Sequence, residues 1–551
     1  MKRPRCHEFQ TRVLHFKKST LGPETIQALG RWPQQYCDIL EKLGHLESIA
    51  RLLRHGGLGT TDFSGIDAPA EGWASLRDVL HDRVGWEEGR GEMLSWVRSC
   101  DCMPEVKQIL ISKSGGRACV FGNILDRLPV EAQEWLKARL ATLETAKPDS
   151  LEWQRTQDHI CTFIEENETW LFPREATSRC ASHDAECFVQ PLVQWEKARS
   201  LPPEERSQKR AWWCAECNDS DVPPLGVDVS GPPCTDYAGT GLQLKSNGKQ
   251  QIWHELWAAM RRMFAKHLTE NVFFFENVWK YPADKLALKL DATHEVRHAV
   301  ESPDNDGFPV RRVRTNMCGV NRLTHVWTGP SQEDFPAALQ DFRGRACELT
   351  GDAFCVAPAE DINAMILEMS KERNTSLPRG WEEKPMVEIM SSLLPIGAID
   401  RLAEHEAVRL ESMAKEGADI VIVDLEQHPG SRGPQGGALW PAMLTHHQMY
   451  NFVKQRLTTP GESFAAQGLD WFPEVSGGRQ VTALKSIVEK LPHHMQKHAV
   501  GNSMHVPSII SFMLFCFAHI RSKADLEKLS PAMPAASADD DDAANSGALD
   551  H

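Results

Sequence analysis

The segment NVFFFENV, residues 271–278, is a short and nearly continuous apolar run. Because it lacks the polar alternation of a half-buried strand, it fits a central strand that is buried on both faces. Strands of this kind belong to parallel sheets, whose two faces are covered by helices. The run therefore predicts a layered α/β fold.

The first part of the chain alternates strands and helices in the way that such a sheet requires. GTTDFSGIDAPAEGWASLRDVL (59–80) predicts a strand, a glycine-containing turn and a helix. WVRSCDCMPEVKQIL (96–110) and RACVFGNILDRL (117–128) repeat the strand-then-loop pattern. QQIWHELWAAMRRMFAKHL (250–268) is apolar at helical spacing and predicts an amphipathic helix before the buried strand.

Changes in composition divide the chain into segments. A charged, tryptophan-rich stretch at about 130–222 is interpreted as an insertion into the α/β domain, and the acidic end of the chain is expected to be disordered. The predicted segments are an N-terminal helical segment (1–50), the α/β domain with its insertion (51–330), a smaller domain (331–483), a return to the α/β domain (484–525) and the tail (526–551).

Composition narrows the class of protein. The net charge of -15 argues against a chain that coats nucleic acid over its whole surface, although a local basic cleft is compatible with it. The 15 cysteines follow no regular framework, which indicates reduced thiols in a cytosolic or nuclear setting. No apolar run reaches the length of a membrane span, so we expect no membrane partner.

One cysteine follows a stiff turn. In LGVDVSGPPC (225–234), a strand-like stretch leads into Pro232 and Pro233, which fix the backbone just before Cys234. Such a turn can present a nucleophile at the carboxyl end of a strand. Taken alone, however, such a motif is more often a proline turn around a buried cysteine, so the nucleophile interpretation needs support from the rest of the chain.

Taken together, several motifs resemble those of the cytosine-5 DNA methyltransferase family, in that family's order. They are DFSGIDAPAEG (62–72), GPPC (231–234), ENV (276–278), RRVRTNMCG (311–319), RLTTPGESFAAQG (456–468) and GNSMHVP (501–507). The resemblance covers roughly residues 55–126 and 222–520. It implies a Rossmann-like methyltransferase sheet with helices on both faces, plus a smaller target-recognition domain at 331–483.

The resemblance implies an enzyme that transfers methyl from S-adenosylmethionine to C5 of cytosine in DNA. Cys234 would add to C6 of a flipped-out base, which makes C5 nucleophilic. Glu276 would hydrogen-bond N3 and the exocyclic amine of the base. Arg312 and Arg314 would hold its O2 carbonyl and favour the thiolate.

Further residues are assigned by the same resemblance. The expected cofactor-binding residues are Phe63, Ser64, Gly65, Asp101, Asn123, Ile124, Pro233, Asn502 and Ser503. Pro232, Asn277 and Val278 are expected to support the loop of the nucleophile, Asn277 through its side-chain amide.

The first motif departs from the family pattern, because Asp67, Ala68 and Pro69 replace further glycines. These side chains are expected to line a loop where the backbone usually approaches the cofactor. A catalytically impaired DNA-binding relative is therefore one alternative, and a tRNA cytosine-5 methyltransferase, with RNA as the partner, is another.

The remaining expectations concern metal, location and assembly. The insertion contains Cys180, His183 and Cys187, followed by the C-x-x-C pair Cys214 and Cys217, a combination that can bind zinc. Because the spacing of the first three is irregular, we predict no metal. Residence in the nucleus follows from the implied DNA substrate and from basic RSQKR at 206–210, and we expect a monomer.

Overall fold

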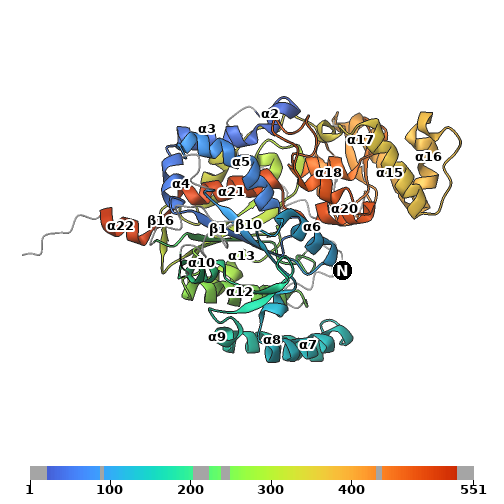
Figure 1. The fold of residues 1–551 in the computed structure, drawn as a ribbon. Helices are drawn as coiled ribbons and strands as arrows, with labels where there is room; N and C mark the ends of the chain where they lie inside the picture. The colour runs from blue at the N-terminus through green and yellow to red at the C-terminus, as the bar shows by residue number, and fades with distance from the viewer. Residues whose placement is uncertain are drawn as a thin grey trace, which may run out of the picture.

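A seven-stranded sheet forms the centre of the protein in a computed structural model that describes residues 22–86, 92–200, 202, 222–237, 248–417, 419–429 and 437–529 (Figure 1). The order of the sheet is β3-β2-β1-β6-β7-β10-β8. The strands are β1 (Gly57–Asp62), β2 (Ser95–Cys100), β3 (Cys119–Phe121), β6 (Leu225–Ser230), β7 (Val272–Val278), β8 (His294–Glu301) and β10 (Arg314–Asn321).

The first five strands of that order are parallel, and β10 runs antiparallel to both of its neighbours, β7 and β8. The sheet is therefore mixed and largely parallel, with its order reversing between β1 and β6. This arrangement confirms the predicted Rossmann-like methyltransferase sheet.

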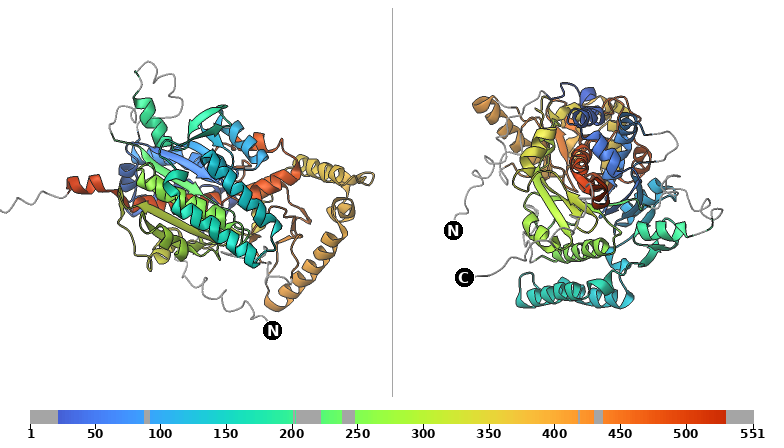
Figure 2. Two further views of the ribbon diagram at one scale, coloured as in Figure 1. Left: turned by 90° about the horizontal axis from the view of Figure 1, so that it is seen from below. Right: turned by 90° about the vertical axis from the view of Figure 1, so that its left-hand side faces the viewer.

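Helices cover both faces of the sheet (Figures 1 and 2). One face carries α3 (Trp32–Lys42), α4 (Leu46–Leu52), α5 (Ala68–Val84), α14 (Phe335–Arg343) and α21 (Val506–Ala518). The other face carries α12 (Gln251–Lys266) and α13 (Ala283–Leu290), with α7 (Val130–Thr145) and α8 (Leu151–Glu166) as a further layer beyond α12. The strand and helix predicted within 59–80 are β1 and α5, and the helix predicted at 250–268 is α12.

Strand β7 shows why the apolar run predicted a doubly covered strand. Phe274 points into the core on the α21 side, where its ring centroid lies 6.0 Å from that of Phe512. Phe273 and Phe275 point to the opposite side and lie 5.3 and 5.1 Å from the ring of Trp257 on α12. All three phenylalanines of the run are fully buried, so both faces of the strand need apolar side chains.

The stretch His493–Ala518 has the length and hydropathy of a membrane span, but 89% of its most apolar window is buried within the protein. It contains two helices, α20 (His493–Gly501) and α21, separated by a turn. Burial of this extent is typical of a core helix, and α21 packs against α4, α5 and α14.

The insertion begins with two helices, α7 and α8. It continues with α9 (Glu168–Leu171), a hairpin of β4 (Thr177–Cys180) and β5 (Ala185–Phe188), and α10 (Pro191–Arg199). The hairpin was not predicted from the sequence. RSQKR at 206–210, Cys214 and Cys217 lie outside the described residues.

The segment 331–483 contributes to two cores. The large core beneath the sheet includes Phe342 of α14, Trp440 of β13 (Trp440–Pro441) and Phe464 of α18 (Pro460–Ala466). A separate core is formed by α15 (Ala359–Glu372), α16 (Met386–Leu393), α17 (Ile396–Glu416), β12 (Ile422–Asp424), β14 (Met449–Asn451) and β15 (Arg456–Leu457). The helices of this second core form one end of the molecule in Figure 1.

Shorter elements complete the fold. They include α2 (Ile26–Gly30), α6 (Pro104–Ser114), η1 (Ile124–Arg127), β9 (Val310–Arg311), β11 (His325–Trp327), α19 (Leu484–Val488), β16 (Ile520–Ser522) and α22 (Lys523–Leu529). Helix α22 occupies the beginning of the segment expected to be a disordered tail, and residues 530–551 lie outside the described residues.

A network of ion pairs is buried inside the sheet domain. Its six members are three carboxylates and three guanidiniums: Asp62, Asp228, Glu270, Arg98, Arg127 and Arg261. No member has a side chain more than 5% exposed. Because the charges balance and each carboxylate has a partner, the network offsets the cost of burying its charges.

Asp62 is the centre of this network. Its carboxylate accepts from Arg127 Nη1 at 2.7 Å, Arg261 Nη2 at 3.0 Å and Arg98 Nη2 at 3.1 Å. Burial alone would raise the pKa of Asp62, but the three guanidiniums hold it below its ordinary value. Asp62 thereby ties its own strand, β1, to β2, η1 and α12.

Replacing Asp62 with asparagine should lower the free energy of unfolding by about 3–5 kcal/mol, because a buried charge network loses one of its partners. Urea denaturation followed by circular dichroism measures the change. The matched control is Glu47→Gln in the exposed i,i+4 pair with Arg51, where a change below about 0.5 kcal/mol is expected. Equal effects of the two substitutions would contradict the assigned role of Asp62.

Candidate active site

Four of the sequence motifs meet at one edge of the sheet. The first motif follows the carboxyl end of β1, GPPC follows that of β6, and ENV ends β7. Antiparallel β10 begins at the same edge, where Arg314 pairs with Val278 and Asn316 with Glu276. In open α/β sheets, ligands bind outside the carboxyl ends of the strands where the strand order reverses, and this edge meets that description.

Two glycines show how closely these segments approach one another. A Cβ atom built on Gly231 would lie 3.0 Å from Cε of Met504, with the backbone oxygens of Glu276 and Phe63 next nearest. A Cβ on Gly65 would lie 3.3 Å from the carbonyl oxygen of Asn502. The last motif therefore folds back onto the first motif and onto the proline loop.

The proline loop is held from two sides. Asn277 Nδ2 donates to the carbonyl oxygen of Pro232 at 3.0 Å, which is the contact expected for this asparagine. His254 Nε2, on α12, donates to the carbonyl oxygen of Pro233 at 2.9 Å. These bonds fix the backbone immediately before Cys234, whose side chain is half-buried.

Opposing effects act on the thiol of Cys234. Burial raises its pKa, and the negative charge of Glu276 acts in the same direction. The guanidiniums of Arg314 and Arg312 lower it. The thiol is thus desolvated, with two cations close enough to favour its ionised form.

The acid and the two guanidiniums form a cluster. Glu276 Oε1 lies 3.0 Å from Arg314 Nε and 3.8 Å from Arg312 Nη2. Arg312 Nη2 also donates to the carbonyl oxygen of Ser503 at 2.7 Å. Burial, reinforced by the charge of Arg314, lowers the pKa of Arg312 to about 10.

A pocket opens beside this cluster. Glu276, Arg312, Arg314 and Met504 are among the residues that line it. The Nε and Nη1 atoms of Arg312 are buried, and neither has a hydrogen-bond partner among the residues that the structure describes. Unpaired buried donors are costly, so these atoms are suited to receiving an acceptor from a ligand.

The first motif shapes the neighbouring part of the edge. Phe63, directly after β1, has a positive φ of 56°, a backbone conformation that is unusual for a bulky residue and that concentrates at functional sites. Ser64 Oγ donates to the carbonyl oxygen of Cys100 at 3.0 Å, which fixes the loop to the end of β2. Gly65 N donates to Asp101 Oδ2 at 3.0 Å.

Asp101 lies at the end of β2, beside the first motif. Its Oδ1 accepts from the backbone N–H of Met103 at 2.9 Å, and burial raises its pKa. Its carboxylate therefore joins the loops after β1 and β2, where the contact with the cofactor was predicted.

The side chains of Asp67, Ala68 and Pro69 were expected to line the loop of the first motif, and that expectation is wrong. Asp67 is only 4% exposed and has a φ of 64°, so it takes the left-handed conformation that glycine adopts easily. Its carboxylate accepts from Thr61 Oγ1 at 3.1 Å and Ser99 Oγ at 3.2 Å. Ala68 and Pro69 are buried at the start of α5, so all three side chains point inward.

The other predicted cofactor residues lie at the edges of this region. Asn123 follows β3 and caps η1, accepting from Leu125 N at 3.0 Å, and Ile124 is buried. Asn502 is exposed and donates to His498 Nδ1 at 3.2 Å. Ser503 is buried, and its hydroxyl donates to the carbonyl oxygen of Met504 at 3.0 Å.

Two residues of the site were missed from the sequence. Asn316 lines the pocket and donates to Glu301 Oε2 at 2.8 Å. Its position two residues after Arg314 was the available signal, since alternate residues of a strand share a face. For His254 the signal was a polar residue on the apolar face of an amphipathic helix.

Comparisons with known proteins gave structural matches alone. No protein-family model matches the chain, and no curated protein matches it. One similar structure is an E. coli prophage-encoded protein described as a candidate DNA modification methyltransferase, at 12% identity and a TM-score of 0.36, covering 83% of this chain and 97% of that one. Others are S. pombe Dnmt2 methyltransferase (11%, TM-score 0.35, covering 86% and 99%) and a DNMT2 mutant of Spodoptera frugiperda (10%, TM-score 0.34, covering 84% and 99%).

The opposing charges around Cys234 predict opposite effects of two substitutions on its reactivity. Arg314→Gln removes a cation, so the thiol pKa should rise and alkylation by iodoacetamide at neutral pH should slow roughly fivefold to tenfold. Glu276→Gln removes an anion, so the pKa should fall and alkylation should accelerate. Peptide mapping by mass spectrometry gives the rate at Cys234 separately from the other thiols.

The pH dependence provides the control. The alkylation profile of Arg314→Gln should move to higher pH and that of Glu276→Gln to lower pH, while the rates at high pH converge. Shifts in the same direction for both variants would show that the charges do not act on this thiol as described.

Proposed function

We propose that this protein transfers a methyl group from S-adenosylmethionine to C5 of cytosine in DNA. The observation that carries the proposal is the cluster of Glu276, Arg312 and Arg314, which lines a pocket at the carboxyl edge of the sheet and whose charges act on the thiol of Cys234. A nucleophile, a carboxyl group and two guanidiniums are the groups that activation of a pyrimidine ring requires. The motif resemblance assigns the same four residues.

Each residue has a distinct task in this proposal. The thiolate of Cys234 bonds to C6 of the base, and the electron pair of the C5–C6 bond becomes available at C5. Glu276 hydrogen-bonds the N3 edge, where negative charge develops as the thiolate adds. Arg312 offers its unpaired Nε and Nη1 donors to the O2 carbonyl of the base.

The residues of the neighbouring edge fit a nucleoside-type cofactor. The backbone of Gly65 approaches that of Asn502 closely, and the half-buried Asp101 carboxylate lies at the ends of β1 and β2, where dinucleotide folds place a ribose-binding acid. Phe63, Ser64, Asn123 and Ile124 would complete the binding surface. When bound, S-adenosylmethionine supplies the electrophilic methyl group.

Reaching C5 and C6 requires that the base leave the helix. Extrusion of a base costs a few kcal/mol, which contacts to the flipped base and the backbone must offset. We assign the contacts with DNA to the segment 331–483, whose second core lies beyond the catalytic sheet.

A covalent trap tests the proposal. Incubation with S-adenosylmethionine and duplex DNA containing 5-fluorocytosine should yield an adduct that survives denaturing electrophoresis, because fluorine at C5 blocks release of the enzyme. Cys234→Ala should abolish the adduct, whereas Cys347→Ala, at a half-buried thiol outside the site, should keep it. Retention of the adduct in Cys234→Ala would refute the role of this thiol.

The nature of the nucleic acid is tested by methyl transfer. Tritiated S-adenosylmethionine is offered with duplex DNA or with tRNA under identical conditions, and we expect labelled DNA. Label found in tRNA alone would show that the substrate is RNA and not DNA, with the same chemistry at the base. Label in neither, with a folded protein, would favour a catalytically impaired relative.

A further inference from the structure

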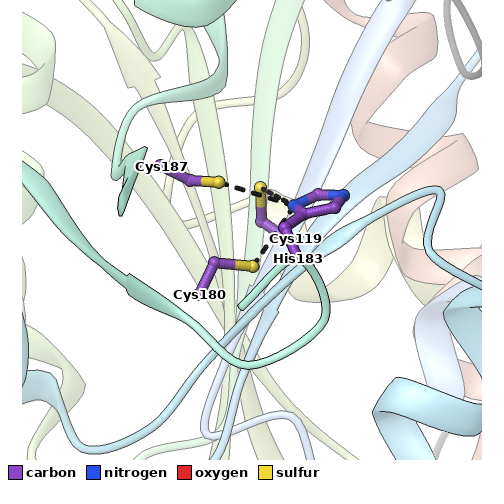
Figure 3. Close-up of side chains that lie close together, drawn as sticks. All are labelled: Cys119, Cys180, His183 and Cys187. Carbon is purple, nitrogen blue, oxygen red and sulfur yellow. Dashed lines mark hydrogen bonds between the residues drawn. The ribbon is translucent and has the colours of Figure 1, made fainter. Parts of the chain in front are cut away.

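Four side chains of metal-ligating types converge beside β3, the outer strand of the sheet at the end opposite β8. Three come from the insertion: Cys180 at the end of β4, His183 in the turn and Cys187 in β5. The fourth, Cys119, is the first residue of the edge strand β3. Cys119 lies 61 or more positions before the other three residues in the chain, yet all four side chains meet at one point (Figure 3).

The distances among these side chains are those of a common coordination sphere. Nδ1 of His183 lies 3.4 Å from the sulfur of Cys180, 3.4 Å from that of Cys187 and 3.6 Å from that of Cys119. All four ligand atoms lie within 4.8 Å of one another. In a tetrahedral zinc site, the usual bond lengths separate nitrogen from sulfur by about 3.6 Å and two sulfurs by about 3.8 Å.

Hydrogen bonding alone does not account for this convergence. Nδ1 of a neutral imidazole has one lone pair, and three thiols point at it. The other ring nitrogen, Nε2, lies 3.0 Å from the carbonyl oxygen of Gly116, to which it can only donate. This bond fixes the tautomer that leaves Nδ1 free to bind a cation, an arrangement typical of metal-ligating histidines.

The surroundings of the sulfurs also suit a thiolate centre. The backbone N–H of Val120 donates to the sulfur of Cys180 at 3.4 Å. A divalent cation held between the three sulfurs would stabilise all of them as thiolates.

We propose that Cys119, Cys180, His183 and Cys187 bind one zinc ion in a closed, structural Cys₃His site. Three thiolates and one imidazole are a common ligand set of structural zinc, and four protein ligands leave no open position for catalysis. Cys119 and Cys180 are buried, and His183 and Cys187 are half-buried, so the ion would be largely shielded from solvent.

The position of the ion gives it a task. It would clamp the β4–β5 hairpin onto β3, where Ala181 N already donates to the carbonyl oxygen of Val120 at 2.8 Å. The hairpin covers an edge strand that would otherwise expose unpaired backbone groups. Strand β3 leads directly to Asn123 and Ile124, so the clamp would also steady the loop assigned to the cofactor.

Metal analysis tests the proposal on the full-length protein. Protein produced with zinc in the medium should contain zinc, and Cys180→Ser and Cys119→Ser should each lose one equivalent per chain. The matched control is Cys161→Ser, at a half-buried thiol of the same insertion, which should lose none. As a second control, the double variant Cys214→Ser/Cys217→Ser should retain the one equivalent of zinc that Cys119→Ser loses.

Two further readouts do not depend on activity. Cobalt bound in place of zinc should give the visible absorption of a tetrahedral site and thiolate charge-transfer bands, which Cys180→Ser should abolish. Removal of zinc by a chelator should lower the midpoint of thermal unfolding by roughly 5 °C or more in the wild type. It should leave the already lower midpoint of Cys119→Ser unchanged.

Three results would overturn the proposal. They are wild-type protein without bound metal after zinc supplementation, a disulfide joining any two of Cys119, Cys180 and Cys187, and a zinc content that Cys119→Ser leaves unchanged. None of these outcomes depends on methyl transfer, so the proposed activity and the proposed zinc site can fail separately.

Discussion

The buried ion pairs around Asp62 are the interaction on which the site depends. Asp62 ends β1 directly before Phe63, and Arg127 ends the helical turn that begins after Asn123. Asp228 lies in β6 just before the proline loop, and its partner Arg261 lies on α12, two turns from His254. One network thus connects the segments that carry the proposed cofactor loop and the proposed nucleophile, Cys234. Its charges are costly to bury, and loss of one partner leaves the others uncompensated.

The same logic applies on a smaller scale to Cys234. Burial disfavours its thiolate, and the guanidiniums of Arg314 and Arg312 counter that effect. Glu276 ties down Arg314 while adding an unfavourable charge near the sulfur. A ligand that engages Glu276 and the free donors of Arg312 would alter this balance, so binding of the base and activation of the thiol would be linked.

Much of the fold and the gathering of the candidate site could be predicted from the sequence. The FFF run required burial on both faces, and the proline-cysteine turn after LGVDVS placed a thiol at a strand end. Asn277 bonds Pro232 as the resemblance implied. The FFF run and the proline-cysteine turn are local features of the sequence. The contact of Asn277 was predicted from motifs whose order along the chain identifies the resemblance.

What the sequence did not predict depends on distant contacts. Cys119 joins Cys180, His183 and Cys187 only because the hairpin folds against the edge strand, and no spacing in the chain encodes that meeting. The Asp67 side chain points inward because its carboxylate accepts hydrogen bonds from the hydroxyls of Thr61 and Ser99. Neither of these polar residues belongs to a motif that would have predicted the contact. Burial of a balanced charge network is likewise a tertiary property, since each member alone reads as a surface residue.

The central claim is that the thiol of Cys234 adds to C6 of cytosine and thereby activates C5. The most direct measurement is release of tritium into water from duplex DNA whose cytosines are tritiated at C5, in the presence of S-adenosylmethionine. The account predicts release by the wild type, none by Cys234→Ala, and strongly slowed release by Glu276→Gln. Release that persists at the wild-type rate in folded Cys234→Ala would contradict it.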